Sequence, residues 1–173
     1  MPDLVILRHA KSAWPPGVPD RDRPLGPRGL RDAPAAGRLL AQSGPLPDLV
    51  LCSPARRTRE TWELAARELP AEPPVRFEPR LYAADAEDIL DTVREVPAGV
   101  GTLLLVGHNP GLQDLVLLLA GTARGGAGGD ALDRLATKFP TSAVAVLAAP
   151  GTWADLTPGG AALTAFEIPR GGR

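Results

Sequence analysis

The stretch LVILRHAKSAW, residues 4–14, passes from four apolar residues directly into Arg8 and His9 and then turns polar. An unbroken apolar run of this kind is typical of a strand that is covered on both faces. A second run, TLLLVGHNPG at residues 102–111, ends in the same way on His108, the only other histidine of the chain. The sequence therefore predicts two buried strands that each end at a histidine.

The bulk composition is that of an ordinary globular protein. The chain has 173 residues, of which 44% are hydrophobic and 23% are charged, so we expect one domain spanning residues 1–173. The net charge of −1 gives no electrostatic reason to bind nucleic acid or an anionic membrane. An anion site would have to be built locally.

Targeting and metal-binding signals are absent from the sequence. The N-terminus lacks the pattern of a secretory signal, and the longest apolar run, near Leu115–Ala120, is too short to span a bilayer. The single cysteine, Cys52, cannot form an internal disulfide. We therefore expect a cytoplasmic monomer. With two histidines and one cysteine in no ligand spacing, we expect neither a metal nor a cofactor.

Apolar runs alternate with amphipathic segments along the chain. Strands are predicted at Leu4–Leu7, Asp48–Cys52, Val75–Phe77, Thr102–Val106, Ala143–Ala149 and Leu163–Ile168. Helices are predicted at Gly26–Gln42, Pro54–Leu69, Ala86–Val96, Pro110–Ala120 and Asp130–Ala136. This alternation indicates a three-layer α/β/α sandwich with a mostly parallel sheet of about six strands. Pro34 should kink or split the first helix.

The segment SPARRTRET, residues 53–61, places arginines at a helix start. Ser53 is predicted as the N-cap and Pro54 as the first helical residue. Arg56, Arg57 and Arg59 then fall where the helix dipole disfavours positive charge. A solvated basic face is one interpretation. The other is that an anion bound at the helix N-terminus neutralises the arginines.

GHNPG, residues 107–111, repeats this arrangement, with Asn109 predicted as the N-cap. A histidine in such a place can be purely structural. However, ligands of open α/β sheets bind outside the carboxyl ends of the strands, and here three strand ends would bring together Arg8 with His9, Ser53 with Arg57, and His108. Arginines suit bidentate contacts with phosphate oxygens, and a neutral imidazole can act as a nucleophile. The sequence thus predicts an active site at this edge.

Three of these segments, LRHAKS, SPARRTRET and VGHNPG, resemble the signature of the histidine phosphatase superfamily, which includes the cofactor-dependent phosphoglycerate mutases. More narrowly, RHAKSAW, DRDRPLGPRGLRDA, LYAADAEDIL, LLVGHNPGL and FPTSAVAVL resemble the SixA-type phosphohistidine phosphatases. The resemblance extends from about residue 4 to residue 167. It implies the phosphoglycerate mutase-like fold.

The resemblance also implies roles for individual residues. His9 would be the nucleophile that forms a phosphohistidine intermediate, Arg8 and Arg57 would bind the phosphoryl oxygens, and His108 would stabilise the transferred charge. Arg23 of the RPL segment either reaches the same pocket or lies on the surface. We further expect substrate contacts from Lys11, Ser12 and Asn109, although exposed loop positions are the alternative for the first two.

One departure from the family pattern concerns the proton donor. Many members carry a glutamate in a Leu-x-Glu pattern after the third strand, and in RLYAAD the matching residue is Ala83. Glu78 and Asp85 lie nearby but out of register, and we interpret them as exposed loop carboxylates. Tyr82 is interpreted as a core or partly buried core residue. Trp14 either lines the pocket entrance or packs.

The sequence therefore predicts a metal-independent phosphatase acting through a phosphohistidine enzyme intermediate, with phosphohistidine in a protein as the substrate. A small phosphorylated molecule is the alternative substrate. A non-catalytic phosphate-binding module is the alternative from another class, but binding alone would not need a nucleophilic histidine.

Overall fold

The computed structural model describes residues 2–121 and 129–172, and in them the chain folds around one six-stranded sheet with the order β3-β2-β4-β1-β5-β6. The strands are β1 (Asp3–Arg8), β2 (Leu49–Cys52), β3 (Val75–Phe77), β4 (Thr102–Gly107), β5 (Val144–Ala148) and β6 (Ala162–Glu167). Strands β3, β2, β4 and β1 are parallel, whereas β5 is antiparallel to both β1 and β6. The predicted mostly parallel sheet is confirmed.

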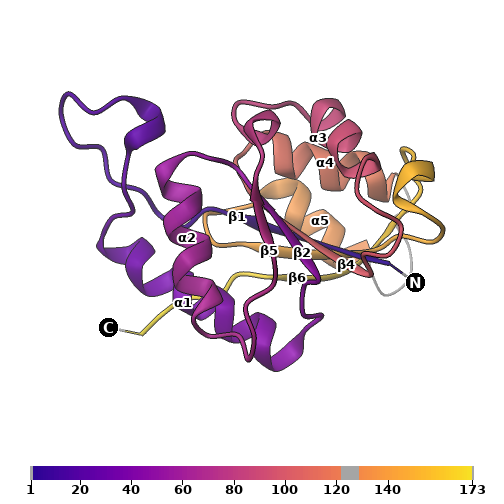
Figure 1. Ribbon diagram of the computed structural model, residues 1–173, viewed down its shortest axis with the longest axis horizontal. Coiled ribbons are helices and arrows are strands. Elements are labelled where there is room, and N and C mark those ends of the chain that lie inside the picture. Colours follow the sequence, from indigo (N-terminus) through magenta and orange to yellow (C-terminus); the bar gives the residue numbers. More distant parts are fainter. Residues whose placement is uncertain (1, 122–128, 173) are drawn as a thin grey trace.

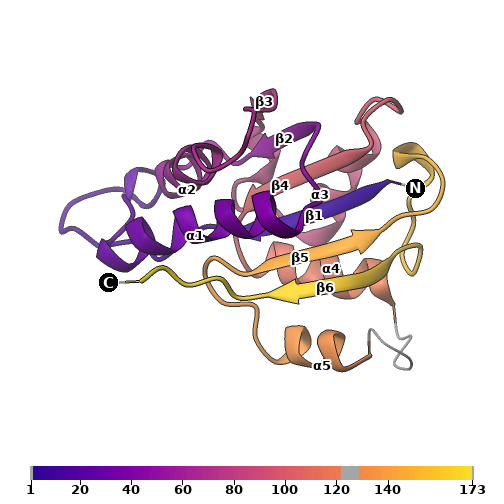
Figure 2. The ribbon, with the colours of Figure 1, turned by 90° about the horizontal axis from the view of Figure 1, so that it is seen from below.

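Helices cover both faces of the sheet (Figures 1 and 2). They are α1 (Pro27–Ser43), α2 (Arg56–Ala66), α3 (Ala86–Arg94), α4 (Gly111–Ala120) and α5 (Gly129–Thr137). On β1, Val5 and Leu7 belong to the core formed with α1 and α2. Leu4 and Ile6 belong to the core formed with α3, α4 and α5. Because successive side chains of a strand alternate between faces, both faces need apolar residues, and the predicted α/β/α sandwich is confirmed.

The first helix is not split at Pro34. It runs from Pro27 to Ser43 with Pro34 inside it, although proline removes one intrahelical hydrogen bond. The helix packs closely on α2, where Gly37 approaches the backbone oxygen of Ala65 so tightly that a Cβ atom would lie 2.2 Å from it. This packing holds the helix along its length, because tertiary contacts supply most of a helix's stability.

Four of the five predicted helix starts differ from the observed ones by one or two residues, and for α2 and α4 the predicted N-caps are wrong. Helix α2 has Ala55 rather than Ser53 at its N-cap, because the Ser53 hydroxyl instead contacts a ring nitrogen of His108. Helix α4 has Pro110 at its N-cap. Asn109 still contributes from one position earlier, since its Oδ1 accepts a hydrogen bond from the Gln113 backbone N–H at 3.2 Å.

The sheet topology brings the predicted site segments together. Arg8 at the end of β1 pairs with Gly107 at the end of β4, and Cys52 at the end of β2 pairs with Val106. The antiparallel β5 begins at the same edge, where the Ser142 N–H donates to the carbonyls of Arg8 and His9 at 3.2 and 3.1 Å. Residues that follow β1, β2 and β4 therefore converge on one end of the sheet.

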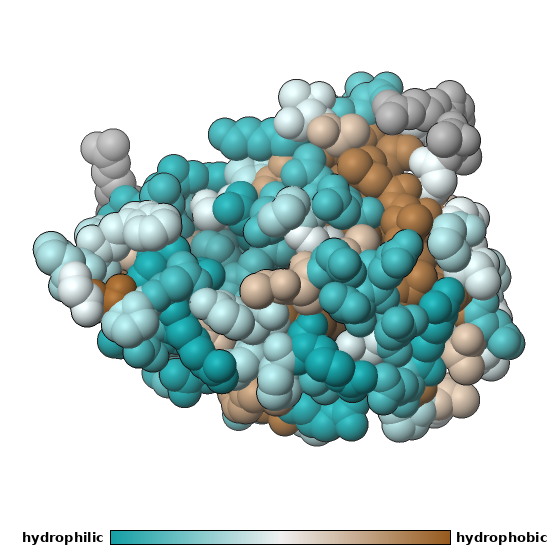
Figure 3. Space-filling model, turned by 90° about the horizontal axis from the view of Figure 1, so that it is seen from above, coloured by the Kyte–Doolittle hydropathy of each residue, from teal (hydrophilic) through white to brown (hydrophobic). Residues whose placement is uncertain are grey.

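Figure 3 shows a largely hydrophilic face on which hydrophobic residues are exposed in a band on one side. None of the helices in the described part of the chain combines the length and apolar character needed to cross a membrane.

Candidate active site

His9 follows directly after β1 and is buried. Its backbone N–H donates to the Gly107 carbonyl at 3.0 Å, which ties it to the end of β4. Its ring Nδ1 lies 2.7 Å from the Ala10 carbonyl oxygen. Because a carbonyl oxygen only accepts hydrogen bonds, Nδ1 carries the proton and Nε2 keeps its lone pair.

The electrostatic environment keeps His9 neutral. Burial lowers its pKa to about 3, and the neighbouring positive charges of Arg8 and Arg57 act in the same direction. A histidine that is neutral at pH 7 with a free Nε2 has the form that a nucleophile requires.

His108 follows β4 and faces His9 across the site, with the ring centroids 5.4 Å apart and the ring planes at 55°. Its Nε2 lies 2.7 Å from the Ser53 hydroxyl oxygen, while its Nδ1 is buried without a hydrogen-bond partner among the described residues. Burial, and secondly the charge of Arg57, lower its pKa to about 4. The Tyr82 ring packs edge to face with the His108 ring, with the centroids 5.6 Å apart and the ring planes at 82°.

Arg8 and Arg57 each offer an unused donor. Arg8 Nη1 donates to the Phe139 carbonyl at 3.0 Å, and Arg57 Nη1 and Nη2 contact Asp20. In both residues the Nε–H is buried without a hydrogen-bond partner among the described residues. Since buried donors are almost always satisfied in native proteins, two orphaned guanidinium N–H groups beside two histidines indicate an anion site.

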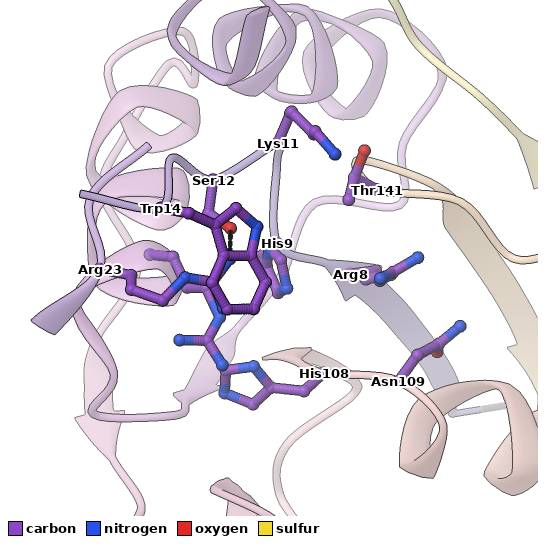
Figure 4. Close-up of a pocket in the computed structure, with 10 residues that line it drawn as sticks. Arg8, His9, Lys11, Ser12, Trp14, Arg23, His108, Asn109 and Thr141 are labelled. Atoms are coloured by element: carbon purple, nitrogen blue, oxygen red, sulfur yellow. Dashed lines mark hydrogen bonds between the residues drawn. The ribbon is translucent and has the colours of Figure 1, made fainter. Parts of the chain in front are cut away.

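These groups line a cavity of about 240 Å³. Figure 4 shows its side chains, with Trp14 lying over Arg23 at the entrance. The lining residues are Arg8, His9, Lys11, Ser12, Trp14, Arg23, Arg57, His108, Asn109 and Thr141. None of these ten residues is a carboxylic acid.

All eight residues that the sequence predicted for the site line this cavity. Their chemical roles stay predictions, but the structure brings them together from the ends of β1 and β4, helix α2 and the loop between β1 and α1. Arg23 is held inside by hydrogen bonds to the Ala13 carbonyl, Asp20 and the Ser12 hydroxyl, so the surface alternative for Arg23 and Ser12 does not hold. Lys11 lines the cavity and is exposed as well.

The arginines of α2 differ in burial because helical spacing places them on different sides of the helix. Arg57 is buried, whereas Arg56 and Arg59 are exposed. Thr61 lies one turn after Arg57; its hydroxyl donates to the Arg57 carbonyl at 2.7 Å and accepts from the Ala10 N–H at 3.0 Å. The side of α2 that carries Arg57 and Thr61 therefore also anchors the backbone after His9.

Sequence reasoning missed three participants. Thr141 lines the cavity, and the Tyr82 hydroxyl donates to Asp20 Oδ2 at 2.6 Å, a contact that the interpretation of Tyr82 as core or partial core does not include. Asp20 lies in the short 3₁₀ helix η1 (Asp20–Asp22). A charged loop such as PDRDRP carries no periodic signal, so only its position in the fold distinguishes Asp20 from the other loop carboxylates.

The carboxylates near Ala83 serve other purposes. Glu78 caps the 3₁₀ helix η2 (Pro79–Leu81) and pairs with Arg80 at 3.0 Å, and Asp85 caps α3 through the Asp88 N–H at 2.9 Å. Ala83 itself has a positive φ of 55°. Neither carboxylate lines the cavity, which agrees with their interpretation as loop residues.

A metal site is not evident in residues 2–121 and 129–172, where no three His, Cys, Asp or Glu side chains lie close enough together to hold an ion.

Comparison with known families matches residues 4–98, more than half of the chain, to the histidine phosphatase superfamily, branch 1. The chain belongs to this superfamily. An uncharacterized protein of Mycobacterium tuberculosis is 45% identical over 164 residues, covering 95% of this chain and 100% of that protein. An uncharacterized protein of Mycobacterium leprae is 42% identical over 168 residues, with coverage of 95% and 100%.

Solved structures place this histidine phosphatase superfamily member beside the SixA proteins. A Nakamurella multipartitia protein, provisionally named the phosphohistidine phosphatase SixA, is 35% identical with a TM-score of 0.83 over 97% of this chain and 96% of its own. The protein histidine phosphatase SixA complexed with tungstate is 21% identical with a TM-score of 0.77 over 96% and 97%; this second likeness concerns the fold alone. The predicted family and its phosphoglycerate mutase-like fold are confirmed.

Proposed function

We propose that this protein is a phosphatase that hydrolyses phosphohistidine in a protein by way of a phosphorylated His9. The observation that carries the proposal is the neutral His9, with its Nδ1 proton held by Ala10, in a cavity that Arg8 and Arg57 also line, two arginines whose buried Nε–H groups have no partner among the described residues. A nucleophile and unused oxyanion donors thus lie in one pocket, the combination that phosphoryl transfer needs.

In the first step His9 Nε2 attacks phosphorus. The bond between phosphorus and the substrate's ring nitrogen breaks, and its electron pair stays with the leaving imidazole, whose other nitrogen has taken a proton from solvent. Arg8 and Arg57 hold the phosphoryl oxygens, and His108 stabilises the charge in transfer. In the second step water attacks the phosphorus on His9, which releases inorganic phosphate and restores the neutral imidazole.

The preference for phosphohistidine follows from the proton balance. A simple alkyl phosphate leaves as an alkoxide unless an acid protonates it, and such help contributes roughly 10²–10⁴-fold. Imidazole, whose conjugate acid has a pKa of about 6.5, leaves far more easily. None of the residues lining the cavity is a carboxylic acid, and Ala83 stands where relatives carry glutamate. The lack of a carboxylic acid that could protonate the leaving group therefore slows hydrolysis least for a phosphoramidate or an aryl ester.

The decisive experiment measures turnover of a phosphohistidine peptide beside a panel of aryl, sugar and other alkyl phosphates. We expect the highest kcat/KM with phosphohistidine, activity with aryl phosphates, and little with alkyl phosphates. Faster hydrolysis of a sugar phosphate than of the phosphohistidine peptide would instead identify a small-molecule phosphatase. Phosphate binding without turnover of any member of the panel would identify a binding module.

A further inference from the structure

Asp20 accepts four hydrogen bonds from three residues around the site, Arg23, Arg57 and Tyr82. Its Oδ1 accepts from Arg23 Nη1 at 3.0 Å, and its Oδ2 accepts from Arg57 Nη2 at 3.1 Å and from the Tyr82 hydroxyl at 2.6 Å. Its backbone carbonyl accepts from Arg57 Nη1 at 2.7 Å. One residue therefore joins the loop after β1, helix α2 and the segment after β3.

The partners of Asp20 line the cavity, but Asp20 does not. Arg23 and Arg57 are lining residues, and their side chains are each 8% exposed, whereas that of Asp20 is 49% exposed. The Asp20 carboxylate thus contacts the arginines without being one of the groups that line the cavity. Asp20 accepts one hydrogen bond from each Nη of Arg57; the guanidinium keeps a second N–H on each Nη, and its buried Nε–H has no partner among the described residues.

The contact with Tyr82 extends this connection to the second histidine. The Tyr82 and His108 rings pack edge to face with their centroids 5.6 Å apart, while the Tyr82 hydroxyl donates to Asp20. These hydrogen bonds, first that from Tyr82 and then those from Arg23 and Arg57, lower the pKa of Asp20 to about 2. Asp20 is therefore an anion at any pH at which the enzyme would work, and it balances part of the charge of the arginines.

We propose that Asp20 is a positioning residue of this site, which holds the guanidinium groups of Arg57 and Arg23 in place at the cavity that they line and fixes Tyr82 beside His108. The proposal rests on the proposed function in taking the bound oxyanion to be a phosphoryl group. Such a role is one of preorganisation: donors that are already aimed need no rearrangement during the reaction.

The test compares Asp20→Ala, Asp20→Asn and Asp20→Glu with Asp22→Asn, a matched control two residues along the same 3₁₀ helix whose side chain is exposed. Three quantities are measured for each variant: the affinity for inorganic phosphate by calorimetry, kcat and KM with p-nitrophenyl phosphate and with a phosphohistidine peptide, and the melting temperature.

For Asp20→Ala we expect weaker phosphate binding and a loss on the order of 10²-fold in kcat/KM, since displacement of a catalytic group by about 1 Å has that cost. The loss should be the same for both substrates and appear in kcat, with a melting temperature close to that of the wild type. Asp20→Asn keeps one acceptor and should lose less, Asp20→Glu should recover part of the activity, and Asp22→Asn should match the wild type. Tyr82→Phe keeps the ring beside His108 and should show a smaller loss.

Three results would overturn the proposal. Unchanged phosphate affinity and kcat in Asp20→Ala would mean that the arginines need no support. Tighter phosphate binding would identify Asp20 as a competitor for the arginines. If the loss of activity among the Asp20 variants paralleled the decrease in melting temperature, and Asp20→Glu did not restore activity, the role of Asp20 would be purely structural. If the wild-type protein does not hydrolyse phosphohistidine, the proposed function fails, but the phosphate affinities of the variants still decide the role of Asp20.

Discussion

Replacement of Arg57 by alanine tests the oxyanion site most directly. The Arg57 side chain is only 8% exposed, so its charge acts on a bound phosphoryl group with little screening by solvent. Two opposite charges about 4 Å apart interact by roughly 4 kcal/mol at an effective dielectric constant near 20. Because about 1.4 kcal/mol corresponds to a tenfold change in rate, we expect kcat/KM to fall by roughly 10³-fold.

The same helix supplies the matched controls. Arg56 and Arg59 are exposed, and Arg56 is engaged with Glu60 at 3.4 Å. Their charges lie in solvent, where salt screens them, so Arg56→Ala and Arg59→Ala should stay within about twofold of the wild type, as exposed ion pairs contribute little. The assay is steady-state hydrolysis of an aryl phosphate and of a phosphohistidine peptide, with the melting temperature measured in parallel.

Two results would refute this reasoning. If Arg59→Ala were as damaging as Arg57→Ala, burial and helical register would not decide which arginine acts. If Arg57→Ala reduced kcat/KM by less than about tenfold while the protein stayed folded, the buried guanidinium would not contact the oxyanion. Arg57→Lys separates charge from geometry: it keeps the charge but loses the planar fork, so a large residual loss is expected.

Three further predictions concern the nucleophile, the proton donor and pH. His9→Ala should abolish turnover and acid-labile labelling of the enzyme, whereas phosphate binding measured by calorimetry should partly survive through Arg8 and Arg57; near-normal turnover would contradict the mechanism. Ala83→Glu should raise kcat/KM for alkyl phosphates more than for phosphohistidine if the new carboxyl reaches the leaving group, and an equal effect on both substrates would contradict the leaving-group argument. Because burial lowers the pKa of His9 to about 3 and that of His108 to about 4, kcat/KM for an aryl phosphate should not fall through protonation of either histidine between pH 7 and pH 5, and titration of either ring near pH 6.5 in the wild-type protein, followed by NMR, would contradict this. The free energy of unfolding should decrease as the pH falls below about 6.5, since the unfolded histidines then bind protons that the folded ones do not, and chemical denaturation across this range measures it.

Local sequence signals predicted the layers of this protein well, because they depend on short-range physics. The runs LVIL (residues 4–7) and LLLV (residues 103–106) are apolar at every position, and only a strand between two helical layers buries all of them. The separation of Arg57 from Arg56 and Arg59 follows from helical spacing alone. The convergence of Arg8, His9 and His108 follows from parallel strands ending at one edge.

Boundaries and caps were less predictable, because side chains choose among competing partners. Ser53 is a good N-cap residue by type, yet its hydroxyl contacts His108, a residue 55 positions later in the chain. Pro34 should interrupt a helix by its own chemistry, yet packing on α2 keeps the helix continuous.

The sequence by itself predicted the family, the α/β/α layers and eight of the ten residues that line the cavity, with a surface position left open for Arg23, Lys11 and Ser12, since each prediction rests on a local motif or on periodic burial. Only the tertiary structure decided which donors are left unused and which loop carboxylate supports them. Asp20 and Asp22 cannot be distinguished by type or neighbourhood in PDRDRP. The fold brings Tyr82 and Arg57, 62 and 37 positions away, to Asp20 alone, because hydrogen bonding depends on distance in space, which a charged loop without periodicity does not encode.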